Sequence, residues 1–317
     1  MLKNLISEIR NFEGIKRKSS VKIAGDILKN VQGFGSTVVG IGDDAAVLKN
    51  QDGYLLFSVD GVLPALVREE PYAAGKASVM VNVNDMYAMG GRPVAMVNVI
   101  ATKNTERLQE ILKGIAKGCE KFKVPMVGGH IHPDSEEDSL TVAIVGTAKH
   151  LLLSTTAKPG QKLIFAVDLK GRPGCRTVRS WDSSSGKSSE EVLERLETLC
   201  LIAEKGFSNT AKDVSMGGIL GTIAILLESS GVGGDIYLDD IPKPQELGMI
   251  DWLKAFLSFG FVLSADLKEA GEILKIFEEK NIAASIIGEV RKNKVVNLAL
   301  GKERGVLFDF NKEAIIG

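Results

Sequence analysis

The stretch VVGIGDDAAVL, residues 38–48, sets Asp43 and Asp44 side by side after Gly42 and between two runs of small apolar residues. The β-branched and small apolar residues on either side predict short strands. Two adjacent carboxylates repel each other, so such a pair is usually either a solvated turn or a site for something positively charged. Which of the two applies here depends on the rest of the chain.

Three further stretches place acidic or amide side chains beside glycines at the end of an apolar run. They hold Asp60 in FSVDG, Asn84 and Asp85 in VNVNDMYAMGG, and Asp213 in AKDVSMGG. Taken singly, each aspartate fits a turn or a helix cap. Asp85 is harder to explain in this way, because it lies inside an apolar helical pattern where an unpaired charge is costly. Together the carboxylates suit a magnesium–nucleotide site, since Mg²⁺ takes one or two carboxylates along with substrate phosphates.

Two of the chain's three histidines, His130 and His132, lie in the stretch MVGGHIHPDS, residues 126–135. The pattern predicts a strand that ends at Gly129, followed by a polar loop that carries both histidines. Three interpretations stay open for them. They are a transition-metal pair, donors that face a phosphate together with the glycine amides, and an exposed loop with incidental histidines.

The segment from Gly171 to Ser189 is rich in glycine, serine and arginine, which predicts a mobile surface loop. Its stretch DSSSGKSS, residues 182–189, is not a phosphate-binding loop. That motif needs a glycine five positions before Gly186, where this chain has Trp181.

Length and composition bound the class of protein. The chain has 317 residues, 44% of them hydrophobic and 25% charged, which predicts two globular domains, here 1–149 and 150–317. Both halves mix strands and helices, so the expected class is α+β (mixed α/β). With a net charge of −1, the chain lacks the excess of positive charge that is typical of proteins that bind nucleic acid. The N-terminus lacks the apolar core of a signal peptide and no run approaches a membrane span, so we expect a cytoplasmic protein with no membrane partner.

Taken together and in this order, the motifs resemble those of the aminoimidazole ribonucleotide (AIR) synthase superfamily, whose fold is called PurM-like. The matching stretches run from about residue 40 to residue 290 and are GIGDDAAVL, SVDGV, KASVMVNVNDMYAMGGRPVAM, VGGH, KDVSMGGI and GFVLSAD…IIGEV. NDMYAMGGRP is particularly similar to the SDLAAMGA segment of thiamine-monophosphate kinase. VGGHIHPD together with WDSSSGK looks like the AIR synthase-related branch called methanogenesis marker protein 2.

The resemblance implies a PurM-like two-domain fold. The N-terminal domain would form a dimeric β-barrel, so a homodimer is expected, and the C-terminal domain would be an α/β sandwich. ATP and magnesium would bind in the cleft between the two domains.

By position, the resemblance also assigns roles to individual residues. The metal ligands would be Asp43, Asp44, Asp85 and Asp213. The cofactor-binding residues would be Gly42, Asp60, Asn84, Gly128 and Gly129. Lys76 matches a lysine ahead of the central helix and would steady the phosphates. Beyond the resemblance, we predict that His130 or His132 touches the acceptor or the γ-phosphate, so the catalytic candidates are Lys76, His130 and His132.

Departures from individual families narrow the activity. Thiamine-monophosphate kinase usually carries an aspartate where this chain has Met216, and another where it has His130. Selenophosphate synthetase needs a cysteine or selenocysteine in an N-terminal glycine-rich loop, whereas the first cysteine here is Cys119. The hydrogenase maturation factor of the superfamily carries its substrate on a C-terminal cysteine, whereas this chain ends NKEAIIG.

These arguments predict an ATP- and magnesium-dependent phosphotransferase, or an ATP-driven activating enzyme, that acts on a small-molecule acceptor. Three alternatives stand beside this prediction. They are a thiamine-monophosphate kinase-like activity, a non-catalytic nucleotide-binding assembly or regulatory protein, and a metallohydrolase built on HIHPD.

Overall fold

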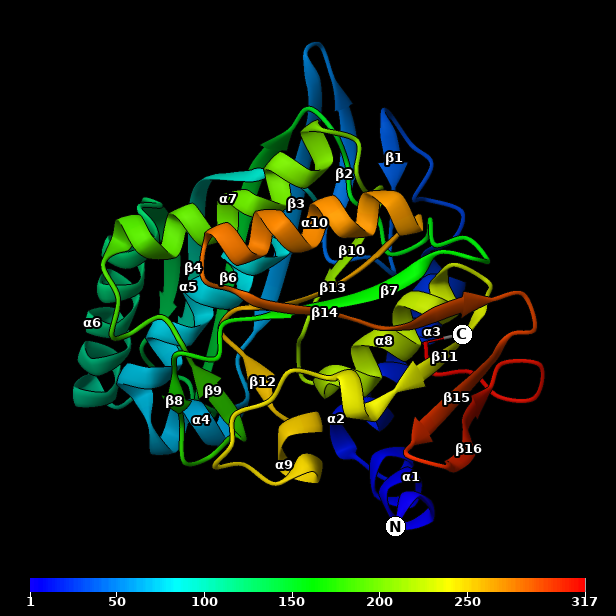
Figure 1. Cartoon of the computed structure of the whole chain (residues 1–317). Helices are drawn as coiled ribbons and strands as arrows, with labels where there is room; N and C mark the ends of the chain where they lie inside the picture. The colour runs from blue at the N-terminus through cyan, green and yellow to red at the C-terminus, as the bar shows by residue number, and fades with distance from the viewer. Residues whose placement is uncertain (317) are drawn as a thin grey trace.

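Two large β-sheets and one small sheet form the framework of the computed structural model, which describes residues 1–316 (Figure 1). The mixture of helices and sheets confirms the predicted α+β class. No helix in this part of the chain combines the length and the apolar character that crossing a bilayer requires.

The first sheet has six strands in the order β1-β2-β3-β6-β4-β5. Their bounds are β1 (Thr37–Val39), β2 (Ala46–Asn50), β3 (Gly53–Gly61), β4 (Arg92–Ala101), β5 (Met126–His132) and β6 (Ser139–Ala148). Neighbouring strands of this sheet pair antiparallel, except that β4 and β5 run parallel. Within residues 1–316, β1 and β5 at the two ends of the sheet do not pair, so the single chain closes no β-barrel.

Helix α5 (Pro71–Ala88) covers one face of the first sheet, follows the short helix α4 (Pro64–Glu69), and packs against α6 (Thr105–Phe122). α5 is buried along most of its length, as its sequence predicts. It ends before Gly90, which has a φ of 76°, a left-handed conformation that glycine adopts without steric cost. α6 begins after Asn104, whose Oδ1 accepts a 2.8 Å hydrogen bond from the N–H of Arg107. Both predicted helices are confirmed.

The opposite face of the first sheet presents apolar side chains to solvent. Phe57 and Val59 on β3, and Val97 and Val99 on β4, are between 42% and 63% exposed. We call the face formed by these four residues the open face. Because successive side chains of a strand point to opposite sides, Ser58 and Asp60 on β3 point toward α5 instead.

The second sheet has seven strands in the order β10-β13-β7-β14-β11-β15-β16. The strands are β7 (Lys162–Val167), β10 (Thr210–Asp213), β11 (Gly233–Tyr237), β13 (Gly260–Ala265), β14 (Ala283–Arg291), β15 (Val295–Leu300) and β16 (Glu303–Asp309). The helices of this half are α7 (Ser189–Glu204), α8 (Gly218–Ser229), α9 (Met249–Leu253) and α10 (Leu267–Glu279), with a 3₁₀ turn, η2 (Leu238–Asp240).

Strand β7 shows how helices cover both faces of the second sheet. Leu163, Phe165 and Val167 belong to the core that contains α8, whereas Ile164 and Ala166 belong to the core that contains α7 and α10. Successive residues of β7 therefore enter the two cores in alternation. Because both faces of the strand are covered, all of its residues in the run LIFAV are apolar.

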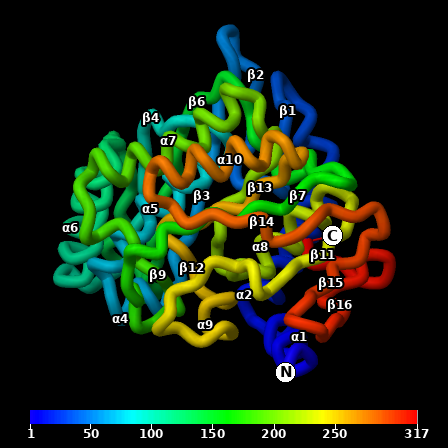
Figure 2. Tube along the Cα trace, in the orientation of Figure 1, coloured from blue at the N-terminus to red at the C-terminus, as the bar shows by residue number. Residues whose placement is uncertain are grey.

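The N-terminal segment begins with two helices that pack against strands and helices of the second half of the chain. It contains α1 (Leu2–Arg10), α2 (Glu13–Lys16), η1 (Arg17–Ser19) and α3 (Ser20–Leu28). Leu5 and Ile9 enter the core with α8, and the guanidinium of Arg10 donates a 2.8 Å hydrogen bond to the carboxylate of Glu313. Figure 2 shows the blue start of the tube beside the red strands β15 and β16.

The segment from Gly171 to Ser189 is not a surface loop throughout, contrary to the prediction. It contains β8 (Arg172–Pro173) and β9 (Ser180–Asp182), which form a small sheet with β12 (Phe256–Leu257). Trp181 is 1% exposed, and its Nε1–H donates a 3.0 Å hydrogen bond to the carbonyl oxygen of Asp168. A buried tryptophan thus fixes the middle of the segment.

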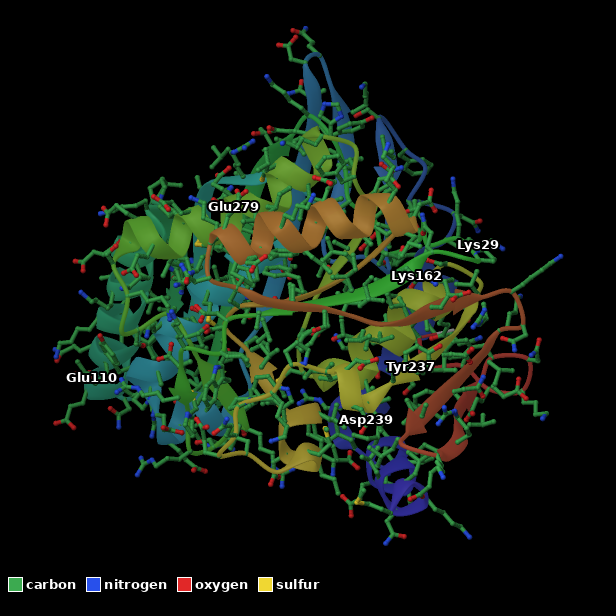
Figure 3. The ribbon with its side chains drawn as sticks, in the orientation of Figure 1. Lys29, Glu110, Lys162, Tyr237, Asp239 and Glu279 are labelled. Atoms are coloured by element: carbon green, nitrogen blue, oxygen red, sulfur yellow. The ribbon has the colours of Figure 1, made fainter. Side chains whose placement is uncertain are left out.

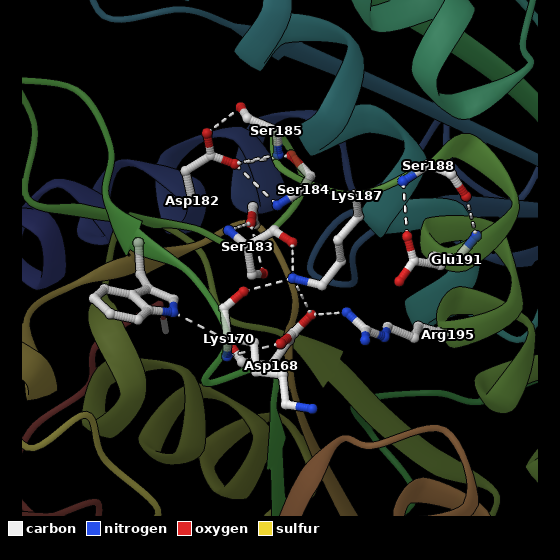
Figure 4. A network of polar contacts seen from close by, with 12 residues as sticks. Asp168, Lys170, Asp182, Ser183, Ser184, Ser185, Lys187, Ser188, Glu191 and Arg195 are labelled. Atoms are coloured by element: carbon white, nitrogen blue, oxygen red, sulfur yellow. Dashed lines mark hydrogen bonds and ion pairs between the residues drawn. The ribbon is translucent and has the colours of Figure 1, made fainter.

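A polar network fixes the end of the same segment (Figure 4). The carboxylate of Asp168, 1% exposed, pairs with the ammonium of Lys187 at 3.1 Å and with the guanidinium of Arg195 on α7. Lys187 also donates a 2.7 Å hydrogen bond to the carbonyl oxygen of Ser183. We call Asp168, Asp182, Lys187 and Arg195 the loop anchor.

Most other charged side chains lie at the outside of the molecule, as Figure 3 shows for Lys29 and Glu279. A buried charge needs a partner, because leaving water costs several kcal/mol. Within residues 1–316 the acidic residues whose whole-residue exposure is below 9% are Asp85, Asp168 and Asp213. Asp168 belongs to the loop anchor, and the other two belong to the candidate site.

Candidate functional site

Three aspartates that are far apart in sequence meet where the two sheets come together. Asp44 lies in the bend before β2, Asp85 lies near the end of α5, and Asp213 ends β10. One carboxylate oxygen of each lies within 4.8 Å of the others. We call these three residues the aspartate trio. The motifs that predicted a cation site thus converge in space.

Lys212 supplies a positive charge to the trio. Its ammonium pairs with Oδ1 of Asp44, while the backbone N–H of Asp213 approaches Oδ2 of the same carboxylate at 3.4 Å. Lys212 is only 6% exposed. Burial alone would lower the pKa of this lysine, but the charges of Asp44 and Asp43 outweigh burial and raise it above its usual range. The lysine is therefore held as an ammonium.

Asp85 meets the first sheet through β3. Its Oδ2 accepts a hydrogen bond from Oγ of Ser58, and Asp60 lies on the same side of the strand, two residues further on. Asp60 is close enough for its negative charge to raise the pKa of Asp85. The site thus contains a fourth carboxylate beside the trio.

Crowding and burial change the proton affinity of these carboxylates. Burial first, and then the negative charge of Asp44, raise the pKa of Asp213 to about 8. Burial also raises the pKa of Asp85 well above its usual range, with the charges of Asp60 and Asp213 adding to the effect. Burial raises the pKa of Asp60 too, although Lys18 of the N-terminal segment opposes the shift. A cation bound among these groups would offset the free-energy cost of holding buried carboxylates in their charged form.

Asp43 plays a different part from Asp44 in this structure. Its Oδ1 accepts a 2.9 Å hydrogen bond from the N–H of Asp44, and its Oδ2 accepts one of 2.9 Å from the N–H of Ser154. Gly42 before it has a φ of 123°, which suits glycine and forms the bend. The structure therefore places Asp43, a predicted metal ligand, in backbone contacts that fix Asp44 in position.

His130 and His132 lie on strand β5, so the predicted polar loop is wrong for these two residues. Their rings contact each other with centroids 4.5 Å apart. His130 pairs in register with Val99, which points to the open face, and His132 follows two residues later on the same side. The structure therefore does not bring the two histidines to the aspartate trio, because Asp60 and Asp85 lie on the other side of the sheet.

Gly128 and Gly129 lie on the same edge strand. Gly129 is in one row with Asn98, Val142 and Asp60, which places it three strands, or about 14 Å, from Asp60. A Cβ at Gly129 would lie 2.5 Å from the carbonyl oxygen of Asn98, so close packing with β4 requires glycine here. Two strands therefore lie between the trio and these two glycines, which were predicted to face the phosphates.

Lys76 also lies away from the trio. It precedes Asp85 by nine residues of the same helix, which is about 13 Å along the axis and half a turn around it. Its ammonium contacts Oγ of Ser185 and lies 3.6 Å from the carboxylate of Asp182. In the structure Lys76 therefore contacts the loop anchor and not the trio.

Asn84 is fully buried next to Asp85. Its Nδ2 donates a 3.2 Å hydrogen bond to the carbonyl oxygen of Ser258, while its Oδ1 has no partner among the described residues. The hydroxyl of Ser258 in turn accepts a 2.8 Å hydrogen bond from the N–H of Ser183. Asn84 therefore connects the helix of Asp85 to the segment that carries the loop anchor.

Lys212 and Ser58 were not among the predicted site residues. Lys212 had a visible signal, because a lysine in the short strand TAKD directly before Asp213 has no obvious place in an apolar strand. Ser58 had none, since its contact with Asp85 depends on which face of β3 meets α5.

The donor set of the trio fits a hard divalent cation. Such cations prefer carboxylate oxygens, and the buried carboxylates repel one another until a positive charge is placed between them. Fold and site together define a two-sheet α+β protein with a buried carboxylate cluster between its sheets.

The chain belongs to the AIR synthase-related family. The family described as "AIR synthase related protein, N-terminal domain" matches residues 42–149, and the corresponding C-terminal domain matches residues 172–301. An uncharacterized protein of Methanocaldococcus jannaschii is 41% identical over 100% of this chain and 99% of its own length. An uncharacterized protein of Synechocystis is 35% identical over 100% and 98% of the two chains. The predicted membership of the superfamily is confirmed.

Two more distant relatives are proteins of named function. Phosphoribosylformylglycinamidine synthase subunit PurL of Pyrococcus furiosus is 28% identical over 80% of this chain, which spans 40% of the PurL chain. The structure of Thermotoga maritima PurL complexed with ATP superposes with a TM-score of 0.72 at 20% identity, over 83% of this chain and 45% of that one. The structure named AaThiL, complexed with AMPPCP and TMP, gives a TM-score of 0.67 at 18% identity, over 90% and 96% of the two chains. These structural likenesses show the PurM-like fold.

Proposed function

We propose that this protein binds ATP together with Mg²⁺ at the aspartate trio and uses the γ-phosphate to phosphorylate or activate a small-molecule acceptor. The observation that carries the proposal is the convergence of Asp44, Asp85 and Asp213 from three separate elements to within 4.8 Å. The structures of PurL complexed with ATP and of AaThiL complexed with AMPPCP and TMP support a nucleotide as the ligand.

In this proposal the chain's own residues position charge. Asp44, Asp85 and Asp213 hold the cation, and Asp43 fixes the bend that presents Asp44. Asp60 and Asn84 border the site from β3 and α5. Magnesium, when bound, neutralises phosphate charge, and chemistry of this kind depends mainly on positioning and electrostatics.

The test is calorimetric titration of the metal-stripped protein with a non-hydrolysable ATP analogue, with and without Mg²⁺. We expect magnesium-dependent binding of about one nucleotide per chain. Absence of binding under both conditions would contradict the proposal. Once binding is established, candidate acceptors are screened by ADP release.

Two further predictions concern the activity. A non-catalytic nucleotide-binding protein would bind the analogue but release no ADP with any acceptor, and a thiamine-monophosphate kinase-like enzyme would release ADP with thiamine monophosphate. Within the described residues the histidine pair belongs to no group of three metal-binding side chains, which disfavours the metallohydrolase alternative. Assignment to the methanogenesis marker branch stays a prediction.

We also propose that the protein forms a homodimer through the open face. Phe57, Val59, Val97 and Val99 form a contiguous apolar surface across β3, β6 and β4, and such surfaces usually mark interaction sites. A dimer joined through this face would also bury His130 and His132. Sedimentation equilibrium should give a dimer for the natural chain and a monomer for Val59→Glu, because the substitution places a charge at the centre of the contact. A natural chain that sediments as a monomer would contradict this proposal.

A further inference from the structure

Lys212 has a place in the fold that calls for an explanation. It lies on β10 between Ala211 and Asp213, in a strand whose four residues are all buried. A buried lysine is rare and costly unless it is paired. Its ammonium pairs directly with Oδ1 of Asp44, and the charges of Asp43, Asp213 and Asp60 also interact with it.

The partner of Lys212 is also a member of the aspartate trio. The carboxylate of Asp44 lies within 4.8 Å of the carboxylates of Asp85 and Asp213, so a cation shared by the three would take an oxygen of Asp44 as a ligand. Both oxygens of Asp44 already meet protein donors, Oδ1 the ammonium of Lys212 and Oδ2 the N–H of Asp213. A divalent cation and the ammonium of Lys212 would therefore compete for the carboxylate of Asp44.

We propose that Lys212 is an internal counter-ion that competes with the divalent cation for Asp44. This inference rests on the proposed function, since it concerns the metal of that site. In the free protein the ammonium partly neutralises the trio and weakens its affinity for free metal ions. A divalent cation that arrives with a nucleotide displaces the ammonium from Oδ1 of Asp44, and the ammonium is then available to a phosphate oxygen.

The consequence is that metal binding depends on the nucleotide. One positive charge does not neutralise the carboxylates that surround it, namely those of Asp43, Asp44, Asp60, Asp85 and Asp213. A divalent cation gains from the remaining negative charge but must first separate Lys212 from Asp44. Phosphate groups offset this cost, because they provide both ligands for the metal and a partner for the lysine.

The test is titration of the metal-stripped full chain with Mn²⁺ in the absence of nucleotide, with free Mn²⁺ followed by electron paramagnetic resonance. We expect Lys212→Gln to bind Mn²⁺ roughly ten-fold or more tightly than the natural chain, since the competing charge is gone. Lys212→Arg, which keeps the charge, should bind within about three-fold of the natural chain. Lys254→Gln is the matched control, because Lys254 is also buried, at 8% exposure, but pairs with Glu8.

Thermal unfolding provides a second readout that does not depend on activity. Without metal, Lys212→Gln leaves Asp44 buried without its partner and should unfold at a lower temperature than the natural chain. Mn²⁺ should raise its unfolding temperature more than it raises that of the natural chain, because at a given concentration a ligand that binds the folded state more tightly stabilises it more.

Each outcome decides between the two proposals. Equal or weaker Mn²⁺ affinity in Lys212→Gln, with clear binding to the natural chain, would overturn the role of Lys212 and leave the metal site in place. No Mn²⁺ binding to any variant, with or without nucleotide, would overturn both. Tighter binding to Lys212→Gln that Lys254→Gln does not reproduce would support the inference.

Discussion

The protein contains two clusters of buried carboxylates, and they are neutralised in opposite ways. At the loop anchor, Asp182 accepts hydrogen bonds from the N–H groups of Ser184 and Ser185 and lies 3.6 Å from Lys76. Burial alone would raise the pKa of Asp182, but the hydroxyl of Ser185, the charge of Lys76 and these N–H groups lower it to about 2. At the aspartate trio, burial and then the charges of neighbouring carboxylates raise the pKa of Asp85 and of Asp213.

This difference in pKa distinguishes carboxylates that stabilise the fold from carboxylates that are available to a ligand. Carboxylates that are fully satisfied by the protein hold a segment in place and have nothing left to offer a ligand. Carboxylates that the protein leaves crowded are kept at a cost in stability, which is the pattern expected of a binding or catalytic site. The four experiments below test this contrast.

Asp85→Asn should have the largest effect. Removing one carboxylate of the trio should reduce ATP turnover by about a thousand-fold or more, because charge stabilisation at the phosphates is lost. Folding should change little, or the metal-free protein should become more stable, since one repulsive charge is removed from a buried site. Steady-state turnover and thermal unfolding of the same preparation measure both effects, and retained turnover would rule out Asp85 as a ligand.

Asp168→Asn should show the reverse pattern. The substitution leaves Lys187 and Arg195 buried without their carboxylate, at side-chain exposures of 10% and 9%, so unfolding free energy should fall by about 3–5 kcal/mol. Urea unfolding measures the loss. Magnesium-dependent nucleotide binding should persist in the folded fraction, and an unchanged stability would show that the anchor is not a structural cluster.

The pH dependence of stability should have opposite signs at the two clusters. Asp213, raised from 3.8 to about 8, contributes stability that is present at low pH and is lost as pH rises toward 8. Asp182, lowered from 3.8 to about 2, contributes stability that is present above pH 3.8 and is lost as pH falls toward 2. The unfolding temperature of the metal-free protein should therefore decline between pH 3.8 and about pH 8 in the natural chain, and should decline less in Asp213→Asn. As pH falls from 3.8 toward 2, the unfolding temperature should also decline, and it should decline less in Asp182→Asn than in the natural chain.

The smallest effect is expected for His130→Ala and His132→Ala. Both side chains lie on the side of the sheet away from Asp60 and Asp85, so magnesium-dependent affinity for the ATP analogue should stay within about two-fold of that of the natural chain. The calorimetric titration above measures it. A loss of acceptor turnover without a loss of nucleotide affinity would assign the histidines to the acceptor, which is one of the two roles predicted for them.

Local sequence patterns predicted the parts of the site that depend on local structure. Asp44, Asp85 and Asp213 each follow or interrupt an apolar run beside glycines, and the structure brings these three together. The helices after Asn104 and before Gly90 were also readable, since a cap and a helix stop are encoded within a few residues.

The remaining features depend on distant parts of the chain. The pairing of Lys212 with Asp44 spans 168 residues, and nothing near either residue specifies it. The face on which His130 lies is set by the register of β5 against β4, and a shift of one residue would reverse it. The composition of the segment from Gly171 to Ser189 indicated a loop, whereas the burial of Trp181 depends on residues around Asp168 and β12.

The core beneath α5 continues into the second half of the chain. Val83 and Met86 of α5 belong to the same cluster of buried residues as Leu199 of α7 and Phe277 of α10. Melting one half would therefore expose apolar surface of the other, so the two halves should unfold in a single cooperative transition. Heat or urea would then abolish the first sheet and the second sheet together, and a nucleotide bound between them would protect the entire chain.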